Sequence, residues 1–206
     1  PLPQTQWQKW YLDNKTCSLS TTPSEEVSEQ AYLMMGDGLT FTTPSFTQDT
    51  EFTGYVKLKL YASSVTTDLD IFAVLRCFDP DGVEVTFTGA HETVPVAMGW
   101  LRASHRKLDL QKTTEYLPVH THDEEQKLVP EQIYALDIEI LPTSIKVPMG
   151  YRLALTIRGK DFCLQDPGRI LHNDPVDRNE TEFGQIAKVF TGPSFESYLL
   201  LPLIGV

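Results

Sequence analysis

The sequence predicts an all-β protein with a two-sheet β-sandwich, and its strand count favours a jelly roll. Three observations lead to this prediction: apolar and polar residues alternate in several short segments, proline and glycine separate those segments, and neither a long amphipathic helix nor an internal repeat is present. Such alternation is typical of strands that bury one face, and eight or nine short strands joined by turns favour a sandwich. At 206 residues the chain is expected to form one domain, residues 1–206.

The clearest strand pattern lies in two segments of the second half of the chain. Apolar side chains occupy every second position of Tyr134–Ile140 and again of Leu153–Ile157, which predicts two paired strands, each with one solvent-facing side. The intervening Leu141–Gly150 contains Pro142 and Pro148. Because proline cannot donate to a strand ladder, this stretch is predicted to be the connection.

The first half of the chain contains further strands. Phe52–Ala62 alternates apolar residues with Lys57 and Lys59, which are expected to face outward, and Leu69–Phe78 is apolar enough for a central strand that is buried on both faces. The other expected elements are an extended Trp7–Leu12, a loop at Ser20–Gln30, a turn at Gly36-Asp-Gly38, a strand at Leu39–Thr43, a turn at Asp79-Pro-Asp-Gly82, a returning strand at Val83–Phe87, an irregular stretch at His91–Val129, a polar loop at Gly159–Glu182, and closing strands at Phe183–Thr191 and Tyr198–Ile204.

Composition and charge narrow the possible partners. A net charge of −11 argues against nucleic acid and acidic membrane surfaces, which attract basic patches. No apolar run approaches the roughly 18 residues that a membrane span needs. The chain begins at Pro1 without a methionine or a signal peptide, so a mature or excised fragment is expected.

The cysteines favour a reducing compartment, whereas the glycosylation sequons favour secretion. Cys17, Cys77 and Cys163 are odd in number and widely spaced, which favours a reducing compartment. Asn14-Lys-Thr16 and Asn179-Glu-Thr181 are sequons for N-glycosylation. The sequence leaves the localisation undetermined, with the cytoplasm favoured over secretion.

No catalytic residue is predicted. A Gly-x-Ser-x-Gly nucleophile elbow needs a glycine on both sides of its serine, and Ser194, which follows Gly192-Pro193, lacks the second glycine. The candidate bases are His91, His105, His120, His122 and His172. Triads are recognised by geometry, so a triad chosen from this set would be arbitrary.

No metal or other cofactor is predicted either, although two alternatives exist. His120-Thr-His122-Asp-Glu-Glu125 places two imidazoles beside carboxylates, a pattern that can hold zinc. Asp68-Leu-Asp70 and Asp79-Pro-Asp81 offer oxygens to calcium. The histidine segment is expected to be a solvated polar loop, and strand edges and turn chemistry explain the aspartates equally well.

Three tryptophans raise the question of sugar binding. Trp7, Trp10 and Trp100 could form a stacking platform. Tryptophans at the ends of a sandwich are more often buried anchors or interface residues, and the expectation is that these three are packed.

Several short motifs occur in an order that resembles a known family. They are Trp10-Tyr-Leu12, Phe41-Thr-Thr-Pro44, Gly54-Tyr-Val56, Thr67-Asp-Leu-Asp-Ile-Phe72, Gly99-Trp-Leu-Arg-Ala-Ser-His-Arg106, Pro142-Thr-Ser144, Gly150-Tyr-Arg-Leu153, His172-Asn-Asp-Pro175 and Leu199-Leu-Leu-Pro202. Together they resemble the C-terminal domain of the X-prolyl dipeptidyl aminopeptidase and cocaine esterase family of serine hydrolases. Leu101-Arg-Ala-Ser-His-Arg106 is the most specific piece, and the resemblance covers essentially the whole chain.

The resemblance implies an architecture and a role. In that family an α/β-hydrolase domain carries the Ser-Asp-His triad, and a jelly roll with a galactose-binding-like fold packs against it. The implied function is a non-catalytic accessory domain whose partner is the hydrolase domain of the same parent chain, with a homo-oligomer as a second possibility. The interdomain candidates are Trp7, Trp10, Trp100, Arg102, His105 and Arg106, within the Trp7–Leu12 arm and the His91–Lys107 stretch.

The sequence leaves alternatives both for the two arginines and for the function of the chain. Arg102 and Arg106 suit bidentate carboxylate contacts across an interface or within the domain, where they would fix the long middle loop. A free-standing carbohydrate-binding module is the alternative function, and an independent hydrolase is the third.

Overall fold

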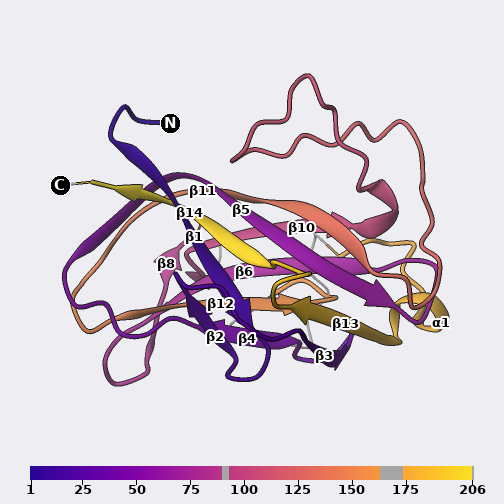
Figure 1. The fold of residues 1–206 in the computed structure, drawn as a ribbon, viewed down its shortest axis with the longest axis horizontal. Helices are drawn as coiled ribbons and strands as arrows, with labels where there is room; N and C mark the ends of the chain where they lie inside the picture. The colour runs from indigo at the N-terminus through magenta and orange to yellow at the C-terminus, as the bar shows by residue number, and fades with distance from the viewer. Residues whose placement is uncertain (90–92, 163–173, 206) are drawn as a thin grey trace.

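The computed structural model describes residues 1–89, 93–162 and 174–205, in which β-strands are the main regular structure (Figure 1). The strands are β1 (Thr5–Asp13), β2 (Ser18–Ser20), β3 (Ser28–Leu33), β4 (Leu39–Thr42), β5 (Thr50–Ser64), β6 (Asp70–Phe78), β7 (Glu84–Val85), β8 (Phe87–Thr88), β9 (Thr93–Val94), β10 (Ala97–Arg102), β11 (Tyr134–Val147), β12 (Arg152–Arg158), β13 (Ile186–Thr191) and β14 (Tyr198–Ile204). A 3-10 turn, η1 (Ala103–His105), and a single helical turn, α1 (Glu180–Phe183), complete the described elements.

Hydrogen bonds link most strands into one path that folds back on itself. The order is β10-β6-β12-β4-β2-β1-β14-β5-β13-β3, with β11 paired to β5 and β7 to β6, while β8 and β9 form a separate small sheet. One layer contains β10, β6, β12 and β4, and the other contains β11, β5, β14 and β1. The all-β sandwich expected from the sequence is confirmed.

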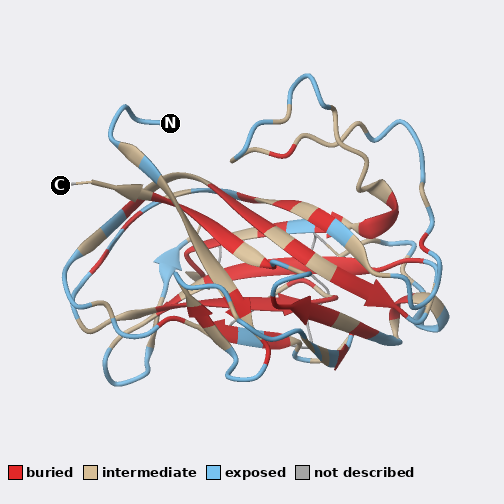
Figure 2. Ribbon diagram, in the orientation of Figure 1, coloured by how far each residue is buried: buried red, intermediate tan, exposed pale blue. Residues whose placement is uncertain are grey.

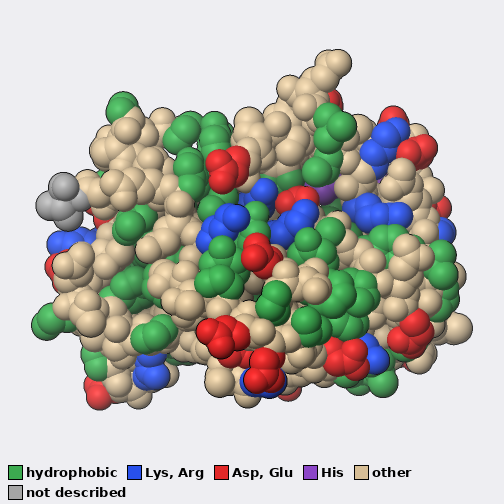
Figure 3. Space-filling model, in the orientation of Figure 1, with side chains coloured by type: hydrophobic (Ala, Val, Ile, Leu, Met, Phe, Trp, Pro, Cys, Tyr) green, Lys and Arg blue, Asp and Glu red, His purple; other side chains and the backbone are tan. Residues whose placement is uncertain are grey.

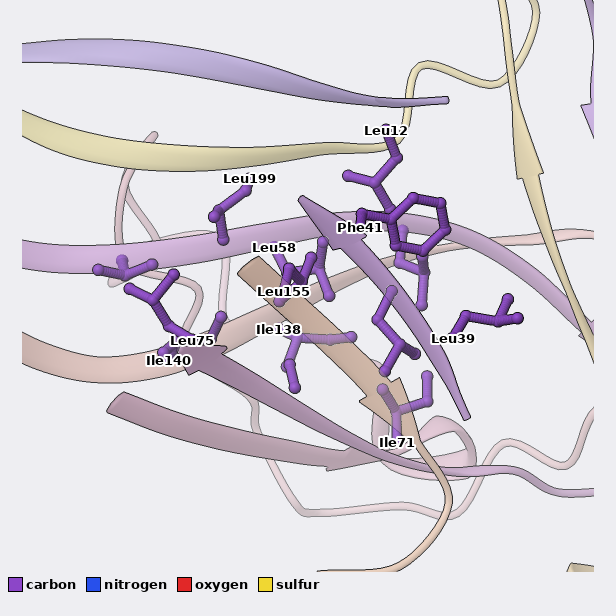
Figure 4. Packing of buried hydrophobic residues seen from close by; sticks show 14 of the residues in the cluster. Leu12, Leu39, Phe41, Leu58, Ile71, Leu75, Ile138, Ile140, Leu155 and Leu199 are labelled. Atoms are coloured by element: carbon purple, nitrogen blue, oxygen red, sulfur yellow. The ribbon is translucent and has the colours of Figure 1, made fainter. Parts of the chain in front are cut away.

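The core lies between these two layers (Figure 4). Leu58 of β5, Ile138 of β11 and Leu199 of β14 meet Leu75 of β6 and Leu155 of β12, and all five side chains are at most 1% exposed. The expected inward face of β5 is confirmed by four residues at alternate positions, Val56, Leu58, Leu60 and Ala62. Burial is concentrated in the strands, whereas the connections are mostly exposed (Figure 2).

The two segments with the clearest alternation are not paired with each other, contrary to expectation. β11 pairs with β5, and β12 pairs with β4 and β6 in the opposite layer. The connection expected at Leu141–Gly150 is also shorter than predicted, because β11 continues to Val147. The strand accommodates Pro142 at a register shift between Ile140 and Thr143, where a missing backbone donor is tolerated.

The solvent-facing side predicted for Leu153–Ile157 is wrong as well. Ala154 and Thr156 are buried, so β12 is covered on both faces. The Thr156 hydroxyl contacts the Thr40 hydroxyl at 2.8 Å and accepts from Arg76 at 3.3 Å. This buried hydroxyl therefore has hydrogen-bond partners within the protein. By contrast, the prediction that Leu69–Phe78 is buried on both faces is confirmed by β6.

The Asp79–Gly82 turn follows the expected chemistry. Gly82 donates to the carbonyl of Asp79 at 3.1 Å and has a φ of 82°, a left-handed value that glycine adopts without strain. Of the predicted return strand Val83–Phe87, only Glu84 and Val85 pair with β6. Phe87 instead belongs to the small β8–β9 sheet.

Other boundaries differ from the predictions at the ends of segments. Ser20–Gln30 is not entirely a loop, because β2 ends and β3 begins within it. Ala97–Arg102 is a regular strand inside the stretch expected to be irregular. Phe183 lies in α1 rather than in a closing strand. His91, Cys163 and His172 lie outside the described residues.

The long connection between η1 and β11, residues 106–133, runs over the outside of the sandwich (Figure 1). Tyr116 from this segment stacks on Trp7 of β1, with centroids 4.6 Å apart and planes 3° apart, and on Tyr55 of β5 at 5.7 Å. The segment is therefore attached to the β1–β14–β5–β11 layer through aromatic contacts.

The described residues include two of the three cysteines and the asparagines of both sequons. Cys17 and Cys77 are free thiols. Asn14 is buried, and its amide donates to the carbonyls of Ser28 and Val189, so this sequon is not accessible in the folded chain. Asn179 is exposed and accepts from the backbone of Glu182 at 2.8 Å. Among the described residues no helix is long and apolar enough to cross a membrane.

Candidate functional site

A cavity of about 380 Å³ lies where β10 and β11, edge strands of the two layers, approach each other. Its walls come from β10, η1, β11 and the 106–133 segment. The lining residues are Gly99, Trp100, Leu101, Arg102, His105, His120, His122, Glu139 and Leu141. Three of the six predicted interdomain residues, Trp100, Arg102 and His105, thus meet at one site.

Gly99 allows the two edge strands to come close together. A Cβ at this position would lie 1.9 Å from the backbone oxygen of Glu139 and 2.7 Å from the Cα of Ile140. Only a residue without a side chain fits this approach. The glycine therefore sets the width of the site at its base.

Arg102 is fixed by carboxylates of its own domain. Its Nε and Nη2 donate to Asp70 of the neighbouring strand at 2.8 and 3.2 Å, and its Nη1 donates to Asp177 at 2.7 Å. Its guanidinium also lies 4.6 Å from the ring of Phe183. The hydrogen bond with Asp70 is the main reason that the pKa of Arg102 is raised. The within-domain alternative for this arginine is therefore observed.

Asp68 holds the turn that presents His105. This carboxylate is fully buried and accepts from the backbone of Ser104 at 3.0 Å and from the Lys127 ammonium at 3.2 Å. Because Lys127 belongs to the 106–133 segment, one carboxylate connects η1 with that segment. The η1 turn with His105 and the 106–133 segment with His120 and His122 are therefore both held next to Asp68, just before β6.

The three histidines of the cavity form a loose cluster. The ring of His122 is 5.8 Å from that of His105 and 6.0 Å from that of His120, measured between centroids. Burial lowers the pKa of His120, and His122 acts in the same direction, while a hydrogen bond with the backbone of Asp137 opposes both. His105 Nδ1 and His120 Nε2 are buried without a hydrogen-bond partner among the described residues.

Glu139 enters the cavity without an ion-pair partner among the described residues. Its cross-strand neighbour Lys57 approaches Asp137 instead, at 3.4 Å, and Lys59 contacts the same carboxylate at 2.7 Å. The pKa of Glu139 is raised because burial penalises its charged form. Lys57 is itself buried, so the outward position predicted for it does not expose it to solvent.

The other three predicted residues lie away from the cavity. Trp7 stacks on Tyr116, and Trp10 packs against Phe46 at 5.8 Å and against the core. Arg106 donates to the carbonyls of Ala103 and Gln126 and lies over the Tyr134 ring, which ties down the middle segment. Trp100 is 45% exposed, so the expectation that all three tryptophans are packed is wrong for this one.

The carboxylates considered for calcium have protein partners. Asp68 and Asp70 bind the basic and backbone groups described above, and Asp79 accepts from the backbone of Asp81 and Val83 in its turn. Within residues 1–89, 93–162 and 174–205, no group of three or more histidine, cysteine or acidic side chains could hold a metal ion.

A family model described as the X-Pro dipeptidyl-peptidase C-terminal non-catalytic domain matches residues 1–200. The chain belongs to this family.

Longer relatives of this C-terminal domain include hydrolases. Cocaine esterase from a Rhodococcus species is 24% identical over 172 residues, which are 82% of this chain and 26% of the esterase. A Mycobacterium bovis protein is 30% identical over 128 residues, 60% of this chain and 19% of that protein. The solved structure of a CocE/NonD family hydrolase from Staphylococcus aureus superposes with a TM-score of 0.89 at 28% identity, covering 99% of this chain and 38% of the hydrolase.

The comparisons confirm the family resemblance that the motifs carry. The C-terminal domain is a non-catalytic part of larger CocE/NonD hydrolases, and this chain spans 19 to 38% of the length of those relatives. The interdomain roles of the six candidate residues stay predictions. Glu139 was missed because the sequence indicates a strand at this point and gives no sign that its outer face lines a cavity. Leu141 was missed because it was expected to begin a connection, whereas β11 continues past it.

Proposed function

We propose that this chain is the accessory domain of a serine hydrolase, that it braces the α/β-hydrolase domain of the same parent protein, and that it shapes the mouth of the substrate cleft. The observation that carries the proposal is an aromatic surface on the outside of the β1–β14–β5–β11 layer. We call it the aromatic face and define it by Trp7, Tyr11, Tyr55, Tyr116 and Tyr198.

Part of the aromatic face lies in register across neighbouring strands. Tyr11 of β1 is opposite Tyr198 of β14, and Tyr198 is opposite Lys59 of β5. The rings of Tyr11 and Tyr198 are 6.0 Å apart, and the ammonium of Lys9 lies 4.5 Å from the Tyr198 ring. Hydrophobic and charged side chains intermix on this side of the molecule (Figure 3).

This composition suits a contact between domains. All five aromatic side chains are half-buried, so each keeps surface that water contacts in the free chain. Tyrosine and tryptophan are enriched in protein interfaces because they combine a large apolar area with a polar tip. Interfaces between domains of one chain typically bury about 600–1,500 Å² and mix apolar with polar contacts, as this face would.

The test is to mix the chain with the separately expressed hydrolase domain of its parent protein. We expect a complex that survives co-purification, with hydrogen-exchange protection gained at β1 and β14. A Trp7→Ala, Tyr11→Ala double variant should weaken the complex, and Leu110→Ala, at an exposed position in the 106–133 segment, is the matched control. Without the partner, the same face is expected to promote self-association.

Two outcomes would contradict the proposal. A complex that forms without added protection at β1 or β14 would show that another face is used. Hydrolysis of aryl esters or Xaa-Pro substrates by the chain alone, abolished by a serine-directed phosphonate, would show an independent hydrolase. We expect no turnover above background, because no serine of the sequence lies in a nucleophile elbow.

A further inference from the structure

We propose that the cavity between β10 and β11 is a binding site for an organic cation, an ammonium or guanidinium group, with Glu139 as its counter-ion and Trp100 as its stacking surface. The proposal goes beyond the accessory role, because it assigns a ligand class to a cavity that lies apart from the aromatic face. It rests on unpartnered ring nitrogens at the cavity, on the charge balance around it and on the exposure of its tryptophan.

The first support is a pair of ring nitrogens that no described protein group uses. His105 and His120 line the cavity, and His105 Nδ1 and His120 Nε2 are buried without a hydrogen-bond partner among the described residues. A neutral imidazole has one nitrogen that donates and one that accepts a hydrogen bond. A buried ring nitrogen without a partner is costly, and a ligand group that reaches it from the cavity would offset that cost.

The second support is the charge around the cavity. Arg102 is the basic residue that lines it, and two carboxylates, Asp70 and Asp177, already neutralise this guanidinium. Glu139 has no ion pair among the described residues, because the nearby Lys57 approaches Asp137. The cavity therefore has an uncompensated negative charge whenever Glu139 is ionised and the three histidines are neutral. A cation that donates hydrogen bonds would compensate it.

The third support is Trp100. Its side chain is 45% exposed on an edge strand and lines the same cavity as Glu139 and the histidines. The face of an indole attracts ammonium and guanidinium groups more strongly than the other aromatic rings do. A carboxylate, imidazole nitrogens and an indole line the same cavity of about 380 Å³, and a cation of this class can contact all of them.

The experiment titrates the full chain with ethylguanidine and, as its neutral counterpart of similar shape, with ethylurea. NMR shifts of the Trp100 indole N–H and of the His120 Cε1–H report occupancy directly. We expect saturable shifts with ethylguanidine and none with ethylurea. A parallel arm uses arginine blocked as its acetyl methylamide: binding at least as tight as ethylguanidine indicates a protein side chain as the source, and exclusion indicates a free small cation.

Variants make the assignment specific. Glu139→Gln keeps the shape of the side chain and should weaken ethylguanidine binding by about tenfold or more, since it removes the counter-ion. Glu25→Gln, an exposed change in the β2–β3 connection, is the matched control and should leave affinity unchanged. Trp100→Leu tests the same site independently at an exposed position, should Glu139→Gln disturb folding.

Three results would overturn the proposal. They are equal binding of ethylurea and ethylguanidine, unchanged affinity in both Glu139→Gln and Trp100→Leu, and saturable shifts of the three histidines with zinc alone while neither cation binds. The last result would identify a metal site instead.

Discussion

Arg102 and Asp70 face each other across β10 and β6 and are joined at two points, Nε to Oδ1 at 2.8 Å and Nη2 to Oδ2 at 3.2 Å. The Asp70 side chain is 4% exposed and that of Arg102 is 17% exposed. Arg178 donates to the same carboxylate at 3.3 Å, so one buried aspartate connects the edge strand with the chain just before α1.

Removing one partner of this pair is expected to destabilise the protein strongly. In an Asp70→Ala variant two arginines would lose their shared carboxylate, and breaking a buried pair typically costs about 3–5 kcal/mol of unfolding free energy. The measurement is urea denaturation followed by circular dichroism. Lys188→Ala is the control, since it removes a pair with Glu29 that is partly exposed at 30% and 55% and should cost less than about 1 kcal/mol. Equal losses would show that Asp70 is not a key contact.

Gly99 is expected to be intolerant of any side chain. In Gly99→Ala the new Cβ would overlap the backbone oxygen of Glu139, and relief requires β10 to move away from β11. We expect a loss of about 1–3 kcal/mol of unfolding free energy, as for other overpacked sites. Gly205→Ala is the control, because its nearest contact is the flexible side chain of Gln6 at 3.0 Å. A Gly99→Ala protein as stable as the control would contradict the close approach.

His120 should make stability depend on pH. Burial lowers its pKa below 6.5, and His122 acts in the same direction, so the folded protein favours the neutral ring. The unfolded chain binds this proton more readily, which means that the contribution is fully present above the unfolded pKa and declines as the pH falls through it toward the folded pKa. His120→Gln should flatten this dependence in urea midpoints between about pH 5 and 8. An NMR titration of the His120 Cε1–H above 6.5 would contradict it.

How far the sequence predicts this fold is best seen in β11 and β12. Alternation correctly identified both strands, because it reports which side chains share a face. It does not report which strand lies alongside, and the Pro148–Gly150 turn that joins a hairpin can equally join two layers. It also does not report what covers the second face: beside β12 that face carries the Arg76–Glu84 ion pair and Phe162, whose ring is 5.0 Å from the Arg76 guanidinium.

The candidate site was only partly predictable for a similar reason. Trp100, Arg102 and His105 come from one motif, and the sequence drew attention to them together. His120 and Glu139 join them because a long polar segment returns to the edge of the sandwich, where two strands of different layers meet. No local pattern encodes such a return, since it depends on tertiary contacts such as Asp68 with Lys127.

Tyr116 is expected to act as the anchor of the 106–133 segment. Its ring stacks on Trp7 and Tyr55, and pairs of this kind are worth about 0.5–1.5 kcal/mol beyond area burial. In Tyr116→Ala we expect hydrogen exchange to accelerate in residues 106–133 while β6 and β12 keep their protection, because the sandwich core does not depend on this contact. Tyr116→Phe retains the ring and is the matched control, with protection close to that of the unchanged protein. If exchange in the segment is the same in both variants, the segment is held instead by contacts such as the ion pair of Lys127 with Asp68, and the aromatic contacts are incidental.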